Sequence, residues 1–153
     1  MIKKLALTLT AALAAGLAVG APAAASDDSL VRSIKGHGID ACPAESLCLY
    51  EHSKYNGDSD ASIWVVSDDV QRLSEHGADD TASSAYLNAP NRWSVSLWRD
   101  VVWCGDHVRL NQVVRGVPSL HDAYGYTGCL GEEKQSHSKI RLNDSVSSVL
   151  FLK

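Results

Sequence analysis

The sequence predicts an all-β protein, a sandwich of two Greek-key units, and three observations support this prediction. From Cys42 onward, short runs of Val, Ile, Leu, Trp and Tyr alternate with clusters of Gly, Asn, Asp and Ser, and no long segment has an apolar period of 3.6. A hairpin-like motif occurs twice, and a loop motif follows it each time. A hairpin followed by a strand that returns beside it forms a Greek key, and two such units can pack as a sandwich.

The N-terminal segment, 1–25, has the features of a secretory signal peptide. Lys3 and Lys4 form a basic head, residues 5–19 are almost all apolar, and residues 21–25 (APAAA) offer a cleavage site before Ser26. The apolar run is short for a membrane-spanning helix, so a membrane anchor is disfavoured. We therefore expect a secreted mature chain that starts at Ser26 and is long enough for one domain with its own core.

The charge of the mature chain argues against two classes of partner. Removal of Lys3 and Lys4 lowers the basic count from 14 to 12 against 18 acidic residues, a net charge of −6. An acidic chain has no electrostatic reason to bind nucleic acid or anionic lipid, whereas it is compatible with cation binding. We expect a monomer with no nucleic-acid partner and no membrane association after cleavage.

Four cysteines in an exported chain indicate two disulfides, for which three pairings are possible. We favour Cys42–Cys48, which closes a tight loop, together with Cys104–Cys129. The second bridge closes a longer loop and contributes about 3 kcal/mol on the chain-entropy model. A zinc site is disfavoured because no C-x-x-C motif occurs and the compartment oxidises thiols.

The elements are expected in the following order. Residues 26–41 are polar, contain two glycines and show no period, which predicts a flexible N-terminal arm before a domain that covers residues 42–153. A helical turn is expected between Asp68 and Leu73. The candidate strands are Leu47–Glu51, Ser62–Val66, Ser84–Asn88, Val95–Arg99, His107–Gln112 and Ser148–Leu152.

The repeated hairpin motif has two aromatic residues five positions apart and a glycine two positions later. Residues 50–57 (YEHSKYNG) and residues 98–105 (WRDVVWCG) share this pattern. The two aromatics can stack across the turn, while the glycine supplies a positive φ. The second unit is longer than the first, and we expect its additional residues between Val113 and Gly131.

The repeated loop motif consists of two Asx-type residues, two free positions and a serine pair. Residues 79–84 (DDTASS) and 143–148 (NDSVSS) each lead directly into an apolar segment. Carboxylate, carbonyl and hydroxyl oxygens at the start of a strand suit a hard cation such as Ca²⁺. The same side chains can instead close turns on their own backbone. Two copies, each following a hairpin motif, favour the cation sites.

This double signature resembles the βγ-crystallin superfamily over residues 42–153. The opening segment 42–50 (CPAESLCLY) is similar to the start of peptidase inhibitor family I36, whose secreted members share the crystallin-like fold and include metalloproteinase inhibitors. The resemblance implies a protein without enzymatic activity. It also implies that the partner is an extracellular peptidase, with a metalloproteinase as the expected target.

The resemblance further implies two calcium sites of modest affinity, with ligands of three kinds. Hydroxyl ligands come from the fifth motif position, backbone carbonyls come from the third position and from the partner hairpin, and the Asx residues supply negative potential or direct ligation. The hydroxyls are those of Ser83 and Ser147, the loop carbonyls those of Thr81 and Ser145, the hairpin carbonyls those of Ser53 and Val101, and the Asx residues are Asp79, Asp80, Asn143 and Asp144. Ser84 and Ser148 are expected to cap the hairpins instead.

The inhibitory contact is expected between Asp106 and Gly128. The family's metalloproteinase inhibitor presents its reactive bond in a short disulfide-bounded loop, whereas the Cys104–Cys129 loop is much longer, and no residue here matches that loop one for one. Deleting residues 116–125 is expected to leave the fold and the calcium response intact while removing inhibition. The candidates are apolar side chains for a thermolysin-like pocket and arginines for a trypsin-like pocket: Val113, Val114, Val117, Leu120, Arg109 and Arg115.

The sequence disfavours two functions other than inhibition. No G-x-S-x-G, H-E-x-x-H or P-loop motif occurs, so an enzyme is disfavoured. Trp64, Trp93, Trp98 and Trp103 could form a carbohydrate platform, but stacking in the core and hairpins is favoured. The remaining alternative is a calcium-binding structural or toxin-like module that inhibits nothing. A projecting 106–128 segment favours the inhibitor, and a segment folded back over the sandwich favours the module.

Overall fold

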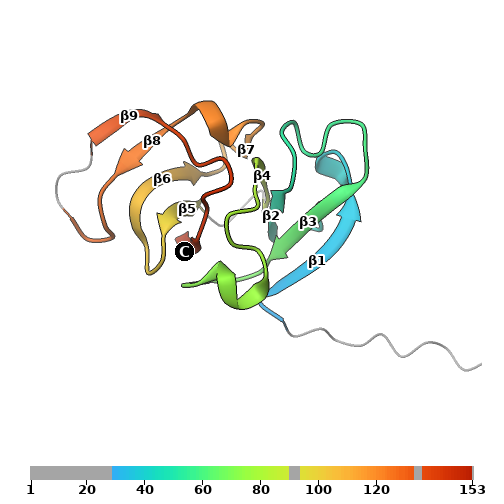
Figure 1. Ribbon diagram of the computed structural model, residues 1–153, viewed down its shortest axis with the longest axis horizontal. Coiled ribbons are helices and arrows are strands. Elements are labelled where there is room, and N and C mark those ends of the chain that lie inside the picture. The colour runs from blue at the N-terminus through green and yellow to red at the C-terminus, as the bar shows by residue number, and fades with distance from the viewer. Residues whose placement is uncertain (1–28, 90–93, 133–135, 153) are drawn as a thin grey trace, which may run out of the picture.

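The computed structural model describes residues 29–89, 94–132 and 136–152, which form two antiparallel five-stranded sheets (Figure 1). The predicted all-β sandwich is confirmed, and only short 3₁₀ helices interrupt it within the described residues. The first sheet contains, in spatial order, β1 (Val31–Gly36), β3 (Ala61–Val66), β2 (Ser46–Tyr50), β4 (Ser84–Asn88) and β7 (Gly116–Val117). The second contains β10 (Ser148–Leu152), β5 (Ser94–Asp100), β6 (Cys104–Leu110), β8 (Ala123–Thr127) and β9 (Ser136–Ile140).

The main core lies between the inner faces of the two sheets. In β2, Leu47 and Leu49 point into this core, and in β5 Val95 and Leu97 do so; all four are fully buried. These positions alternate along each strand because successive side chains point to opposite faces of a sheet. The hydrophobic pattern read from the sequence therefore located all six predicted strands to within a few residues.

Each Greek-key unit contributes one short segment to the sheet of the other unit. Val117 of β7 pairs with Ala85 of β4, so the second unit extends the first sheet. Reciprocally, Val70 forms an isolated antiparallel bridge with Val149 of β10. The two halves therefore share both sheets, and each half completes the sheet of the other.

The two folded hairpins are closed by the serines expected to cap them. Ser84 Oγ donates to the carbonyl of His52 at 2.7 Å and accepts from Tyr55 N at 3.0 Å. Ser148 makes the equivalent pair of bonds in the second hairpin, to the Asp100 carbonyl at 2.7 Å and from Trp103 N at 3.2 Å. In the first hairpin the rings of Tyr50 and Tyr55 pack edge to face at 5.5 Å.

The expected flexible arm is in part a strand, which corrects the sequence interpretation. Residues Val31–Gly36 form β1 and pair along their whole length with β3. The following 3₁₀ helix η1 (Ile39–Ala41) leads to Cys42, which joins Cys48 and Ile63 in a second, smaller core on the outer face of the first sheet. A polar strand at a sheet edge has no strong periodicity, because most of its side chains face solvent.

The additional residues of the second unit lie later than predicted. The 3₁₀ helices η2 (Leu73–His76) and η3 (Leu120–Asp122) are equivalent, and η2 starts where the expected turn at 68–73 ends. After η3 the chain forms the hairpin of β8 and β9, for which the first unit has no counterpart (Figure 1). Gly125 in β8 permits this packing, since a Cβ there would meet the carbonyl of His107 and the side chain of Ile140.

Both favoured disulfides are present. The Cys42–Cys48 bond joins the middle of β2 to the segment before it, and Cys104 at the start of β6 is bonded to Cys129 after β8. The predicted signal peptide, residues 1–25, lies outside the described residues. Within the described residues, no helix has the length and hydrophobicity needed to span a membrane.

Candidate functional site

The two Asx-Ser loops occupy equivalent positions in the two units. Ser83 N donates to the carbonyl of Tyr50, and Ser147 N donates to the carbonyl of Trp98, both at 2.8 Å. Asp80 and Asp144 have positive φ angles of 53° and 50°. Aspartate tolerates this left-handed conformation better than most residues do, which explains why an Asx residue precedes the two free positions in each loop.

Each Asx-Ser loop is hydrogen-bonded to the other loop, and we call each place where a serine of one loop meets an aspartate of the other a crossing. Asp144 N donates to the carbonyl of Ala82 at 2.9 Å, and Asp80 N donates to the carbonyl of Val146 at 3.3 Å. The side chains cross in the same way, because Ser83 Oγ donates to Asp144 Oδ1 at 3.3 Å and Ser147 Oγ donates to Asp80 Oδ1 at 3.5 Å. Each predicted hydroxyl ligand therefore lies beside a carboxylate from the other loop, a pairing that the sequence did not reveal.

Negative charge concentrates where the loops cross. Burial, followed by the charge of Asp79, raises the pKa of Asp80; a hydrogen bond from Ser147 opposes this shift, and the charge of Asp144 adds to it. Asp79 Oδ1 is buried and has no hydrogen-bond partner among the described residues. Mutually repelling carboxylates and a buried oxygen without a partner are the features that a bound cation would stabilise.

A depression of about 500 Å³ opens on the first of the two crossings. Its lining includes Thr81, Ser83 and Asp144, together with Glu51 and His52 of the first hairpin. Apart from the imidazole of His52, the ligand groups that line it are oxygens, which suit a hard cation. Among the described residues, no three His, Cys, Asp or Glu side chains cluster as a metal site, so the donor set depends on hydroxyls and carbonyls as well as carboxylates.

A second feature is the turn that joins β6 to β7, residues 111–115. Asn111 Oδ1 accepts hydrogen bonds from the backbone N–H groups of Val113 and Val114 at 2.8 and 2.9 Å. Asn111 N in turn donates to the carbonyl of Val114 at 2.9 Å. The turn presents Val113, which is 91% exposed, and Val114, which is 48% exposed. Three local hydrogen bonds therefore hold an apolar tip in one conformation.

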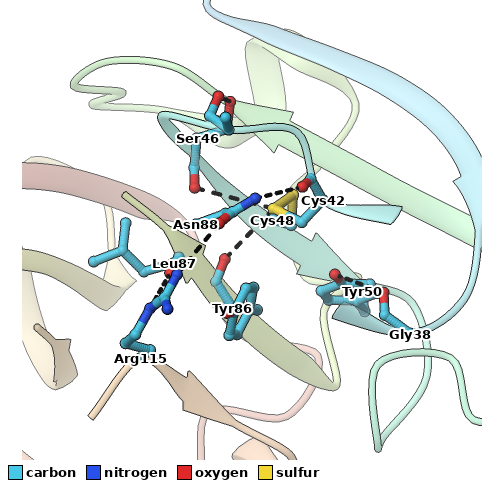
Figure 2. Close-up of a disulfide and its surroundings, with 10 residues drawn as sticks. Gly38, Cys42, Ser46, Cys48, Tyr50, Tyr86, Leu87, Asn88 and Arg115 are labelled. Atoms are coloured by element: carbon cyan, nitrogen blue, oxygen red, sulfur yellow. Dashed lines mark hydrogen bonds between the residues drawn. A yellow bond between two sulfur atoms is a disulfide. The ribbon is translucent and has the colours of Figure 1, made fainter. Parts of the chain in front are cut away.

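Arg115 fixes this turn to the first sheet, near the Cys42–Cys48 disulfide (Figure 2). Its guanidinium donates to the carbonyl of Leu87 at 3.4 Å and to Asn88 Oδ1 at 3.2 Å, and Asn88 Nδ2 donates to the carbonyl of Cys42 at 2.7 Å. The guanidinium also lies over the ring of Tyr86, 5.3 Å from its centroid. We call residues 111–115 with these contacts the clamped turn.

The other candidates for the inhibitory contact are placed differently. Leu120 is fully buried in the main core, so it cannot enter a peptidase cleft. Val117 is half-buried in β7, and Arg109 is exposed on β6. The 106–128 segment is therefore folded into both sheets, which by the criterion set from the sequence favours the non-inhibitory module. Its most exposed apolar residue is Val113, at the tip of the clamped turn. Asn111, which shapes that tip, was missed from the sequence, although an Asn that starts a turn is a recognisable signal.

Comparison with solved structures gives the class of fold. A structure described as "Evolution of the eye lens beta-gamma-crystallin domain fold" matches with a TM-score of 0.53 and 23% identity, covering 79% of this chain and 97% of that chain. The N-terminal domain of Protein S matches with a TM-score of 0.44 and 17% identity, covering 70% of this chain and 94% of that domain. Because its sequence identity is low, the first match establishes the βγ-crystallin fold and nothing more about function.

A separate comparison gives a match to a protein family. Residues 37–110 match the model of the family described as peptidase inhibitor family I36, which confirms the resemblance seen in the opening segment. The match runs from just before η1 to the end of β6, and so includes the first disulfide and the first Asx-Ser loop. No curated protein matches the chain.

Proposed function

We propose that this protein is a secreted peptidase inhibitor that enters the cleft of an extracellular metalloproteinase with the tip of the clamped turn. The observation that carries the proposal is Val113, which is 91% exposed on a turn closed by three hydrogen bonds. An apolar side chain of this size fits a thermolysin-like specificity pocket. The match to peptidase inhibitor family I36 supports the class of target.

The rigidity of the turn favours inhibition over cleavage. Binding a flexible loop loses the entropy of its side chains and backbone, whereas a turn already held in one conformation avoids most of that cost. The Asn111 bonds fix the tip, and the contacts of Arg115 with Leu87 and Asn88 fix its base. A segment held at both ends would also stay in place if a peptidase cut the exposed bond.

We further propose that each crossing of the Asx-Ser loops binds one Ca²⁺. In this assignment Ser83 acts with Asp144 at the first crossing and Ser147 acts with Asp80 at the second. The loop carbonyls of Thr81 and Ser145 complete the protein ligands, together with a hairpin carbonyl such as that of Ser53 or Val101. Bound calcium would neutralise the carboxylates and tie the two units together.

Substitution of both tip valines should abolish inhibition without unfolding the protein. In the variant Val113→Asp, Val114→Asp, two charges replace apolar side chains that must be desolvated in the cleft, and we expect inhibition at least about 100-fold weaker, as for the centre of an interface. The measurement is the inhibition constant against a thermolysin-like peptidase. Circular dichroism should show a melting temperature within a few degrees of the parent, since Val113 is 91% exposed and Val114 is 48% exposed.

A matched control lies at the opposite end of β6. Val102 and Leu130 are 46% and 48% exposed beside the Cys104–Cys129 disulfide, so they offer a second apolar, disulfide-held surface. The variant Val102→Asp, Leu130→Asp should inhibit as the parent does. If it loses inhibition while the tip variant keeps it, the contact is at this disulfide rather than at the clamped turn. If the parent inhibits neither metallo- nor serine peptidases, the non-inhibitory calcium-binding module is the better account.

A further inference from the structure

The β8–β9 hairpin places a set of aromatic rings on the outer face of the second sheet. Along β8, Ala123 and Gly125 are buried, whereas Tyr124 and Tyr126 point to the opposite face. His137 of β9 stacks on Tyr124 at 6.1 Å and meets the edge of Tyr126 at 4.9 Å. The ring of Tyr126 also stacks on buried His107 at 5.5 Å. The set is therefore anchored in the fold at one end and exposed at the other.

The exposed end borders a groove of about 500 Å³. Tyr124, which is 69% exposed, lies in its wall with Tyr126 and His137. Arg109 and Asp122 also line the groove and provide hydrogen-bond donors and acceptors beside the rings. A concave site with aromatic walls and a few polar groups is typical of a small-molecule site.

The charged side chains that line the groove, Arg109 and Asp122, have opposite signs, which favours a polar ligand without net charge. Asp122 accepts from Lys139 Nζ at 2.7 Å and lies 3.2 Å from His121 Nδ1, so these two side chains hold its carboxylate in position. Hydrogen bonds from Lys139 and His121 lower the pKa of Asp122, which keeps it an acceptor. A carboxylate and the guanidinium of Arg109 on the same groove favour hydroxyl groups, which both donate and accept.

We propose that this groove binds a neutral oligosaccharide, with a sugar ring stacked on Tyr124. The apolar C–H face of a sugar fits an exposed aromatic ring, and its hydroxyls fit Asp122 and Arg109. A carbohydrate platform built from the tryptophans was disfavoured in the sequence, in favour of stacking in the core and hairpins. Trp98 is 1% exposed and Trp64 is 9% exposed, so these two are core residues, and Trp93 lies outside the described residues. The proposal does not depend on peptidase inhibition.

The test is an NMR titration of the mature protein with chitotriose, cellotriose and maltotriose, each up to about 10 mM, a range that detects millimolar dissociation constants. We expect saturable shifts confined to the groove with at least one trisaccharide. Tyr124→Ala should weaken that binding about tenfold or more, and Tyr124→Phe should restore it, because the ring and not the hydroxyl makes the contact. Ile39→Ala, an exposed apolar control on η1, should bind as the parent does.

Two results would overturn this inference: no saturable shift with any of the three sugars, or a Tyr124→Ala variant that titrates like the parent. Asn111 and Val114 of the clamped turn also line the groove, so the tip variant can affect both sites. Tyr124 is not part of the clamped turn, so Tyr124→Ala should inhibit peptidases as the parent does. Failure of the saccharide site and failure of the inhibitory turn are therefore distinguishable in the same set of variants.

Discussion

A chain that lacks residues 116–125 is expected not to fold, contrary to the expectation from the sequence. The deletion removes β7, which extends the first sheet from β4, and most of β8, which pairs with β6. It also removes Leu120, whose side chain is fully buried and whose N–H donates to the Ser83 carbonyl at 2.9 Å. Loss of a buried leucine alone costs about 2–5 kcal/mol, against a total stability of about 5–15 kcal/mol for a domain.

Single substitutions separate the buried and exposed parts of the same segment. Urea unfolding followed by tryptophan fluorescence should show Leu120→Ala destabilised by about 2–5 kcal/mol. Val113→Ala should change the free energy of unfolding by no more than about 0.5 kcal/mol, because its side chain is almost fully exposed. A Leu120→Ala variant with the parental urea midpoint would show that this segment does not pack as described.

Calcium is expected to raise the melting temperature of the parent by several degrees. The double variant Ser83→Arg, Ser147→Arg is expected to show no such shift. A ligand that binds only the folded state at about 100 times its dissociation constant stabilises by about 2.7 kcal/mol at each site. Each arginine would place a positive charge beside the carboxylate that faces the serine. The readout is the calcium-dependent shift in each variant, so any destabilisation by arginine itself cancels. If magnesium shifts the parent as far as calcium does, the sites are not calcium sites.

The crosswise arrangement has its own test, a double-mutant cycle on the calcium-dependent shift. Once Ser83→Arg has removed the first site, Asp144→Asn should have little further effect, because both residues serve the same crossing. Asp80→Asn should still remove the second shift, because Asp80 faces Ser147. Coupling of Ser83 with Asp80 instead would mean that each loop binds its cation alone.

The repeated motifs were enough to predict the two-unit sandwich. Apolar alternation marks strands such as β2 and β10 because one or both of their faces are buried. The polar strands were missed because they lack this burial. In β9 only Ile140 is buried, and β7 is two residues long, so neither carries a periodic pattern. The hairpin of β8 and β9 has no counterpart in the first unit, so the repeat could not locate it.

The sequence predicted which residues belong to the candidate sites, but not which of them lie together in the fold. The Asx-Ser loops were recognised from their spacing, yet the crosswise pairing of Ser83 with Asp144 depends on how the two units pack. The apolar residues of the 106–128 segment looked alike in sequence. Leu120 is in the core and Val113 is at the tip because η3 turns inward and Asn111 turns outward, and local composition does not encode that difference.

The most direct test of the account is a titration of a thermolysin-like metallopeptidase, held at a concentration well above the expected dissociation constant, with the purified mature protein. A trypsin-like serine peptidase is titrated in parallel. The account predicts that metallopeptidase activity falls linearly to zero near one equivalent of inhibitor, while trypsin-like activity is unchanged. Full metallopeptidase activity at several equivalents, or rapid degradation of the protein at the Val113–Val114 bond without inhibition, would contradict it.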